Sequence, residues 1–289
     1  MALLSINLLG SFKVTLANEP VTNFATDKVR ALLAYLALSP DHPYRRETLA
    51  GLLWPEFPER SARTNLRNAL ANLRQVICDG AASPPFLRST RQTIQFNGQS
   101  NYWLDAQAFE DLLVIQPVMG VQLEQALSLV RGPFLNGFSL ADAAPFEEWL
   151  LLRREHYGRL VVEALDKLVA SHERHGAYEL ALSSARQRAE LAPWQEEGQR
   201  QLMRLLVYTG RRAAALTSYE MHRQALAREL GVEPAPETKR LYTRIREGNL
   251  DRPAMTPVEE YAEAVRSSYP DFLQQESDAI APPSFVARE

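Results

Sequence analysis

The chain has 289 residues, of which 46% are hydrophobic and 23% are charged, and its net charge is −3. This length can bury two ordinary hydrophobic cores, and no apolar run approaches the ~18 residues that a membrane span requires. Its single cysteine, Cys78, excludes an intramolecular disulfide and any cysteine-based zinc site. The N-terminus lacks the basic region of a signal peptide. We therefore expect a soluble, cytoplasmic protein.

The charge is unevenly distributed. Residues 1–100 carry a net charge of +4, residues 101–250 carry −2, and residues 251–289 carry −5. Between Arg60 and Arg91 there are six arginines and one acid, Asp79. A basic patch on one part of an otherwise acidic protein is typical of a nucleic-acid-binding surface.

The N-terminal third begins with two predicted strands, because apolar and polar side chains alternate over residues 4–8 and 12–16, before a turn at 18–20. Helical spacing of apolar residues then predicts a first helix from a Thr26 cap to Ser39-Pro40. A shorter second helix is predicted from near Arg45 to Trp54-Pro55.

The third predicted helix, residues 59–77, has an unusual surface. Its apolar stripe consists of Ala62, Leu66, Ala69, Leu70, Leu73, Val76 and Ile77. Arg60, Arg63 and Arg67 run along one flank, Thr64 and Asn68 face directly away from the stripe, and no acid follows Glu59. Guanidiniums and amides read phosphates and base edges, so this is the predicted DNA recognition helix.

Two strands are predicted after this helix, at residues 86–87 and 94–96, with Ser89, Thr90 and Arg91 at the tip between them. A basic hairpin that follows a basic helix is typical of the wing in a winged helix-turn-helix. The predicted DNA-contacting residues are therefore Arg60, Arg63, Thr64, Asn65, Arg67 and Asn68 of the helix, Arg88, Thr90 and Arg91 of the hairpin, and Arg45 and Arg46. Solvation explains Arg45 and Arg46 equally well, and Arg74 could simply complement the helix macrodipole.

Residues 102–248 are predicted to be nearly continuous helix with a period of 34, in which Gly176 matches Gly210 and Ala181 matches Ala215. This is the period of tetratricopeptide (TPR) repeats, whose stacked helix pairs form concave surfaces for proteins or peptides. Pro193 and Pro234 are 41 residues apart, so the second copy should contain a helix about two turns longer.

Several strings resemble a known family. RALLAYLAL, RETLAGLLWPE and ARTNLRNALANLR resemble the OmpR-type winged-helix half of SARP-type bacterial transcriptional activators. WLDAQAFEDLL, RGPFLNGF and FEEWLLLRRE resemble their bacterial transcriptional activator domain, although the chain has Ala192-Pro193 where the family commonly has Asp-Pro. The resemblance implies a mostly α fold: an OmpR-like winged helix at 1–98, a TPR-like domain at 99–248 and an acidic, proline-containing tail at 249–289.

The resemblance also implies partners. Double-stranded DNA and RNA polymerase are expected, with homodimers bound to direct repeats. In OmpR-like proteins the loop after the second helix meets RNA polymerase, so Trp54, Glu56 and Phe57 are the candidate contacts. Alternatively, Trp54 and Phe57 merely fill the core.

No enzyme activity, catalytic residue, cofactor or metal is expected, because the phosphate-loop, dinucleotide, zinc-protease and nucleophile-elbow motifs are all missing. His172 and His175 share a helix face, but they lack a third ligand and are expected to be a solvated pair. Trp149, Trp194 and Tyr219 are expected to be core wedges between helices.

The predicted function is sequence-specific DNA binding and transcription activation. The alternative is a protein-interaction adaptor whose winged helix does not bind DNA. The last residues, SFVARE, resemble the string that opens the nucleotide-binding domain of large regulators of this type. That resemblance implies that a longer ATPase continues from here, whereas a disordered tail could end in these letters by chance.

Overall fold

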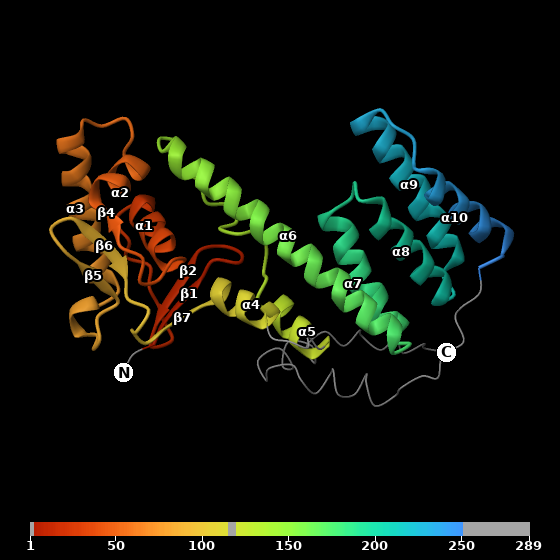
Figure 1. The fold of residues 1–289 in the computed structure, drawn as a ribbon, viewed down its shortest axis with the longest axis horizontal. Helices are drawn as coiled ribbons and strands as arrows, with labels where there is room; N and C mark the ends of the chain where they lie inside the picture. Colours follow the sequence, from red (N-terminus) through yellow and green to blue (C-terminus); the bar gives the residue numbers. More distant parts are fainter. Residues whose placement is uncertain (1–2, 115–119, 251–289) are drawn as a thin grey trace, which may run out of the picture. The chain divides into compact units, whose positions relative to one another are not determined.

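The computed structural model describes residues 3–114 and 120–250, which form two compact units (Figure 1). Unit 1 contains residues 3–114 and 126–161, and unit 2 contains residues 120–125 and 162–250. Unit 1 thus extends beyond residue 98, where the sequence suggested a boundary. The tail from residue 251, including its predicted short helix and the SFVARE ending, lies outside the described residues.

Unit 1 begins with a four-stranded sheet in the order β3-β2-β1-β7. Strands β1 (Leu4–Asn7) and β2 (Lys13–Leu16) are antiparallel as predicted, and a turn at Ala17 and Asn18 connects β2 to β3 (Glu19–Pro20). Both turn residues have positive φ, as a two-residue hairpin of type I′ requires.

Strand β7 (Tyr102–Leu104) corrects the prediction of helix from residue 102. It pairs in parallel with β1, so that Leu4 lies opposite Tyr102 and Ile6 lies opposite Leu104. Three residues are too few to show a period of two, and only the free edge of β1 makes them a strand.

Three helices pack together in unit 1, close to their predicted positions: α1 (Asp27–Ala37), α2 (Arg46–Leu53) and α3 (Glu59–Val76). Thr26 occupies the N-cap position of α1, but its side chain makes no capping hydrogen bond. The buried stripes of the three helices meet at Leu32, Leu33, Leu36, Leu49, Leu53, Leu66 and Leu73. This core holds α3 with its polar face outward.

A second sheet, in the order β4-β6-β5, forms the hairpin. Strands β5 (Leu87–Ser89) and β6 (Thr93–Phe96) are antiparallel, with residues 90–92 at the tip, so Ser89 lies in a strand and not at the tip. The short strand β4 (Tyr44–Arg45) pairs with β6 just before α2 begins. A 3-10 turn, η1 (Asp79–Ala81), links α3 to β5.

A buried carboxylate fixes the end of β1. Asp105, the first residue of α4 (Asp105–Val114), accepts hydrogen bonds from the backbone N–H groups of Leu8 and Leu9 at 2.8 and 2.9 Å. Arg131 pairs with the same carboxylate at 2.9 Å. Burial is the largest influence on Asp105 and raises its pKa, while these donors act in the opposite direction.

Unit 1 also contains the first part of α6 (Ala144–Arg174). Trp149 lies against Tyr35, Phe134 and Phe146, with ring centroids 5.0–6.0 Å apart, and therefore acts as the predicted wedge. Tyr157 stacks on Phe134 at 5.1 Å.

Unit 2 consists mainly of helices: α7 (Tyr178–Leu191), α8 (Glu196–Tyr208), α9 (Arg212–Leu230) and α10 (Pro236–Glu247). With 19 residues against 14, α9 is longer than α7, which confirms the direction of the prediction, but the difference is less than the expected two turns. Gly176 and Gly210 both have positive φ at equivalent turns of the two repeats. The repeat pattern therefore corresponds to two successive helix pairs, α6 with α7 and α8 with α9.

Two aromatic predictions in unit 2 differ in outcome. Tyr219 is buried and stacks on Tyr242 with ring centroids 4.1 Å apart, as expected of a wedge. Trp194 is 45% exposed, so the prediction that it is a core wedge is wrong. It precedes α8 in the loop after α7, outside the positions that face the helix interface.

The expectation of a solvated histidine pair is also wrong. His172 is 2% exposed, and its Nε2 lies 3.4 Å from Oε1 of Glu124 in α5 (Gly120–Ser128). Nδ1 of His175 is 2.7 Å from the carbonyl oxygen of Ser171. The residue that covers His172, Glu124, comes from α5, 48 residues earlier in the chain, so no local pattern predicts this burial.

Candidate nucleic-acid interface

The outer face of α3 has the predicted arrangement. Ala62, Leu66, Ala69, Leu70 and Leu73 are buried, whereas Arg60, Thr64, Arg67 and Asn68 are exposed and Asn65 is half-buried. Within the described part of the chain, the guanidiniums of Arg60 and Arg67 have no ion-pair or hydrogen-bond partner. These two cations are available to an external anion.

Arg63 differs from its two neighbours. Its Nη2 lies 2.6 Å from Oε1 of Glu47 in α2 and 2.6 Å from Oε1 of Glu59. Helix α3 has no acidic residue after Glu59, as the sequence shows. The carboxylate of Glu47 comes from α2, however, and the sequence of α3 alone could not predict this contact.

Two other polar residues of α3 serve the module itself. Arg74 donates to Oγ of Ser89 at 2.9 Å and lies 3.4 Å from Oδ2 of Asp79, so it connects the helix to the hairpin. The side-chain oxygen of Asn72 accepts the backbone N–H of Ala25 at 3.0 Å. Neither side chain is directed at an external ligand.

The hairpin tip is held by Thr90. Its Oγ1 accepts the backbone N–H groups of Gln92 and Thr93 at 3.1 and 3.0 Å, and Arg46 donates through Nε and Nη2 to its carbonyl oxygen. Thr90 and Arg46 therefore shape the tip, while Arg45, Arg88 and Arg91 remain exposed.

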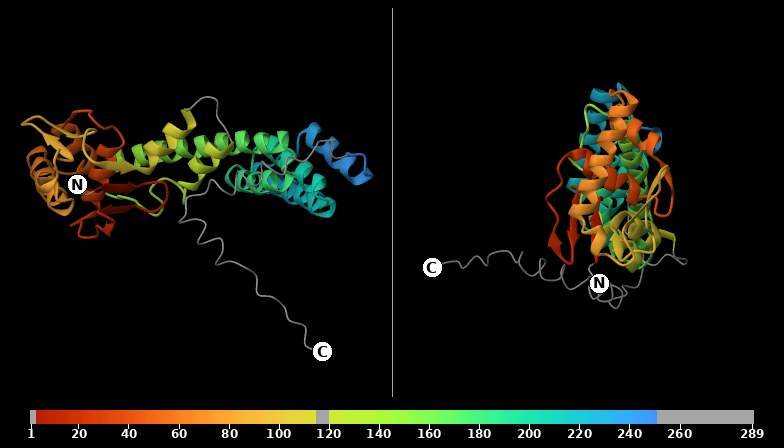
Figure 2. Two further views of the ribbon diagram at one scale, coloured as in Figure 1. Left: turned by 90° about the horizontal axis from the view of Figure 1, so that it is seen from below. Right: turned by 90° about the vertical axis from the view of Figure 1, so that its left-hand side faces the viewer.

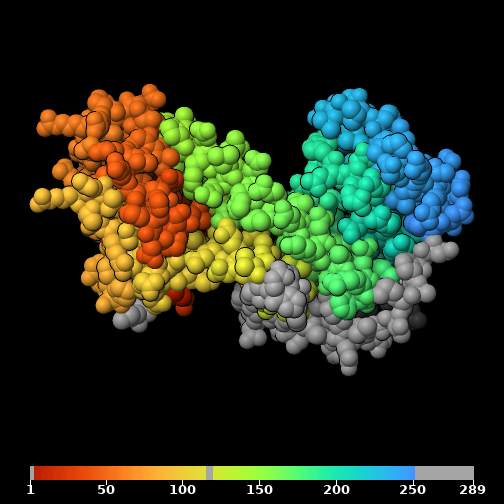
Figure 3. All heavy atoms as spheres, viewed as in Figure 1, coloured from red at the N-terminus to blue at the C-terminus, as the bar shows by residue number. Residues whose placement is uncertain are grey.

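Helix α3 and the hairpin of β5 and β6 lie side by side in unit 1 in the different views (Figures 1 and 2), and Arg74 joins them through Ser89. In the space-filling view, atoms of the orange and yellow-orange segments that contain these elements project on the same side (Figure 3). A helix and a hairpin that present cations together can track a major groove and the adjoining backbone.

The loop between α2 and α3 contains two aromatic residues in different environments. Trp54 is 7% exposed and Phe57 is 46% exposed, while Nζ of Lys28 lies 5.4 and 5.9 Å from the two ring centroids. Glu56, between them, is exposed. The alternative of a core plug therefore fits Trp54, whereas Phe57 and Glu56 are accessible to a partner.

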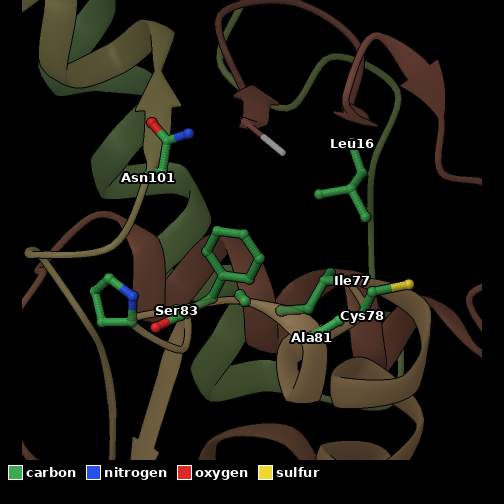
Figure 4. Close-up of a pocket in the computed structure, with 9 residues that line it drawn as sticks. Leu16, Ile77, Cys78, Ala81, Ser83 and Asn101 are labelled. Atoms are coloured by element: carbon green, nitrogen blue, oxygen red, sulfur yellow. The ribbon is translucent and has the colours of Figure 1, made fainter. Parts of the chain in front are cut away.

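A small pocket of about 80 Å³ lies where α3 ends (Figure 4). Leu16, Ile77, Ala81 and Phe86 make its lining mainly apolar, and Ser83, Asn101 and the exposed Cys78 are also at its wall. Its residues form no arrangement of acid, base and nucleophile. Among the described residues, no group of three metal-ligating side chains occurs, and no helix has the length and apolar character of a membrane span.

Comparisons with known proteins agree with this architecture. The family model for the bacterial transcriptional activator domain matches residues 119–246. The transcriptional regulatory protein EmbR of Mycobacterium tuberculosis is 29% identical over 265 residues, which are 84% of this chain and 63% of EmbR. The regulatory protein AfsR of Streptomyces griseus is 27% identical over 268 residues, 88% of this chain and 26% of AfsR. The transcriptional regulator RedD of Streptomyces coelicolor is 28% identical over 258 residues, 83% of this chain and 69% of RedD.

A solved structure of Mycobacterium tuberculosis EmbR in complex with a low-affinity phosphopeptide shares the fold. Its TM-score is 0.65 at 22% identity, and the match covers 97% of this chain and 71% of that one. The chain thus spans only part of the length of EmbR, and less than a third of AfsR.

Proposed function

Because this chain is a relative of the SARP-type transcriptional regulators and carries a bacterial transcriptional activator domain at residues 119–246, we propose that it is a sequence-specific, DNA-binding transcription activator. It acts in the cytoplasm. The winged helix at residues 1–98 binds promoter DNA, and the TPR-like domain at 99–248 contacts a second protomer or the transcription machinery. RNA polymerase meets the loop that carries Glu56 and Phe57.

The observation that carries this proposal is the polar face of α3. Arg60 and Arg67 are exposed cations whose guanidiniums have no partner among residues 3–114 and 120–250, and they flank Thr64 and Asn68 opposite the buried stripe. With α3 in the major groove, the flanking guanidiniums reach phosphates and Asn68 reaches base edges. Arg88 and Arg91 of the hairpin add backbone contacts.

Substitutions at Arg67 and Asn68 test the proposal, because the two side chains have different roles. Arg67→Ala should weaken binding to every sequence and lower the slope of log affinity against log salt by about one unit. Asn68→Ala should cost about 1–3 kcal/mol at one base position only. Gel-shift titrations over a salt series, with duplexes selected from genomic DNA and with random duplexes, measure both effects.

The exposed Arg159 on α6 provides the matched control, since Arg159→Ala removes the same charge away from α3. It should leave both DNA affinities unchanged. Equal, sequence-independent losses in Arg67→Ala and Asn68→Ala would contradict the assigned roles. Wild-type protein that shows no salt-sensitive DNA binding would favour the adaptor, in which the winged helix does not bind DNA.

A further inference from the structure

The contacts of Arg63 set it apart on the DNA-facing side of α3. Its Nη2 donates to Oε1 of Glu47 at 2.6 Å and is also 2.6 Å from Oε1 of Glu59. All three side chains are exposed, at 48%, 59% and 73%. The pair is therefore accessible to DNA and is not a buried structural salt bridge.

Occupation of Nη2 has a chemical consequence. A guanidinium can make a two-pronged contact through its Nη1/Nη2 edge or through its Nε/Nη2 edge, and both edges include Nη2. The hydrogen bond from Nη2 to Glu47, with the Glu59 carboxylate also 2.6 Å away, therefore competes with both of these two-pronged contacts. Arg60 and Arg67, one turn away on either side, carry no such restriction.

The local charge is also reversed. Arg63, Glu47 and Glu59 together carry a net charge of −1 in the middle of a face whose other charged groups on α3 are cations. Because two carboxylates balance its charge, Arg63 offers no net positive charge to a phosphate when DNA binds only through its backbone. An exposed carboxylate–guanidinium pair is weak, so a two-pronged contact to a guanine can replace it, whereas a single contact to a screened phosphate cannot.

We infer that Glu47 is a specificity-determining residue, which keeps Arg63 paired on non-specific DNA and releases it only where a base edge offers a two-pronged acceptor. This inference rests on the proposed DNA-binding function. Glu47 competes from a different helix, so its effect on binding passes through Arg63.

The structure also offers a purely structural role for Glu47. It lies in the first turn of α2, where a carboxylate complements the positive end of the helix macrodipole. That role would change the stability of α2 but not the ratio between specific and non-specific affinity. The ratio is therefore the decisive measurement.

The experiment compares Glu47→Gln with wild type on two duplexes of equal length, one selected from genomic DNA by the wild-type protein and one of random sequence. Glu47→Gln should bind the random duplex roughly two- to fivefold more tightly, the fold-change equivalent to an exposed ion pair. Its salt slope on that duplex should steepen, because Arg63 then contacts phosphate. Affinity for the selected duplex should change less, so the specificity ratio falls.

Further variants isolate the contact. Glu19→Gln removes one exposed negative charge from β3, which forms no ion pair with Arg63 in the described part of the chain, and should leave the ratio unchanged. In an Arg63→Ala background, Glu47→Gln should have no further effect on the random duplex. Thermal unfolding of each variant identifies any loss of folding. Glu59→Gln removes the second carboxylate near this nitrogen and should shift the ratio in the same direction by a smaller amount.

The outcomes are distinguishable. If Glu47→Gln raised the affinity for both duplexes equally, or if its effect persisted in the Arg63→Ala background, Glu47 would act by general repulsion of DNA. Either result would overturn this inference but not the proposed DNA-binding function. Salt-sensitive binding by wild type with an unchanged ratio in Glu47→Gln would also overturn it while the proposed function stands. Failure of the wild-type protein to bind either duplex would overturn both.

Discussion

The buried pair of Glu124 and His172 shows how burial acts on a single residue. Burial raises the pKa of Glu124 to about 7 and lowers the pKa of His172 to about 4. Both shifts favour the uncharged form. Between these values the two side chains, 3.4 Å apart, form a neutral carboxylic acid and imidazole pair.

The pair should give unit 2 a pH dependence that single substitutions uncover. The raised pKa of Glu124 contributes stability below its ordinary value of 4.5, and this is lost as the pH rises to about 7. The lowered pKa of His172 contributes stability above 6.5, and this is lost as the pH falls to about 4. In the wild type the two slopes oppose each other across the overlapping range.

Glu124→Gln should therefore leave a stability that rises with pH between about 4 and 6.5, and His172→Gln one that falls between 4.5 and about 7. Each slope can reach at most about 1.4 kcal/mol per pH unit. Urea unfolding at a series of pH values, followed by circular dichroism, measures it. Variant curves that run parallel to the wild-type curve would show that neither group titrates with a shifted pKa.

Single residues of the interface were predictable only where their environment comes from their own helix. The period of α3 places Arg60, Arg67 and Asn68 opposite the buried stripe, and all three are exposed. Glu47, which accepts from Arg63, and Thr90, which accepts from Arg46, lie 16 and 44 residues away from those arginines. A local sequence pattern cannot show contacts over such distances. The pairing of Arg63 with Glu47 and the support of the hairpin tip by Arg46 therefore became visible only in the structure.

At the scale of elements, the packing of α7 on α8 depends on one glycine. Gly198 is buried in α8 at the point where the guanidinium of Arg188 passes, and a Cβ there would overlap that group. Arg188 is itself buried and donates to Asp166 at 2.7 Å and to Gln195 at 2.9 Å. Alanine at position 198 would push the guanidinium off its carboxylate.

Gly198→Ala should destabilise unit 2 by roughly 2–4 kcal/mol, because the displaced cation stays buried without its full set of partners. The matched control is Gly158→Ala in α6, where nothing lies within 4 Å of an added Cβ. That change should stabilise its helix by up to about 1 kcal/mol. Thermal and urea unfolding measure the stability of both variants. If Gly198→Ala raised the free energy of unfolding as Gly158→Ala should, Arg188 would be able to move aside without losing stabilising contacts.

Substitutions at the two aromatic residues of the loop between α2 and α3 should affect different properties, one the stability of unit 1 and the other transcription activation. Trp54→Ala should destabilise unit 1 by about 3–5 kcal/mol, because it empties a buried site. Phe57→Ala removes an exposed ring and should change stability by less than about 1 kcal/mol, yet abolish transcription activation without weakening DNA binding. In vitro transcription with RNA polymerase, alongside gel shifts and thermal unfolding, tests this. A Phe57→Ala variant that activates normally would remove the ring from the polymerase contact.

The elements themselves followed from periodicity when they were long enough to show it. The helices α1, α2 and α3 begin and end near their predicted positions, and the proline spacing anticipated that α9 is longer than α7. The strands β4 and β7 were missed, since they have two and three residues and exist only because β6 and β1 offer a free edge. Short strands are defined by their neighbours and not by their own sequence.

For the whole molecule, charge distribution matters more than net charge. The chain is net negative, yet the exposed arginines of α3 and the hairpin concentrate positive charge on one face of unit 1. One winged helix with a few phosphate contacts binds DNA weakly at physiological salt, and two on adjacent half-sites gain affinity by mutual tethering. A pair of protomers is therefore the expected binding form.

If the two protomers have the same orientation, half-sites about 10–11 base pairs apart bring both recognition helices to the same face of the duplex. Hydroxyl-radical footprinting on a selected promoter should then show two protected half-sites in direct repeat. Inserting about 5 base pairs between them turns the second half-site by half a helical turn, so the protomers lose contact and affinity should fall about 10-fold or more. An insertion of about 10 base pairs returns the second half-site to the same face of the duplex, and it serves as the control for the added spacing alone. A footprint over one site, an inverted repeat, or equal affinity for the two insertions would show that the protomers do not bind as an aligned pair.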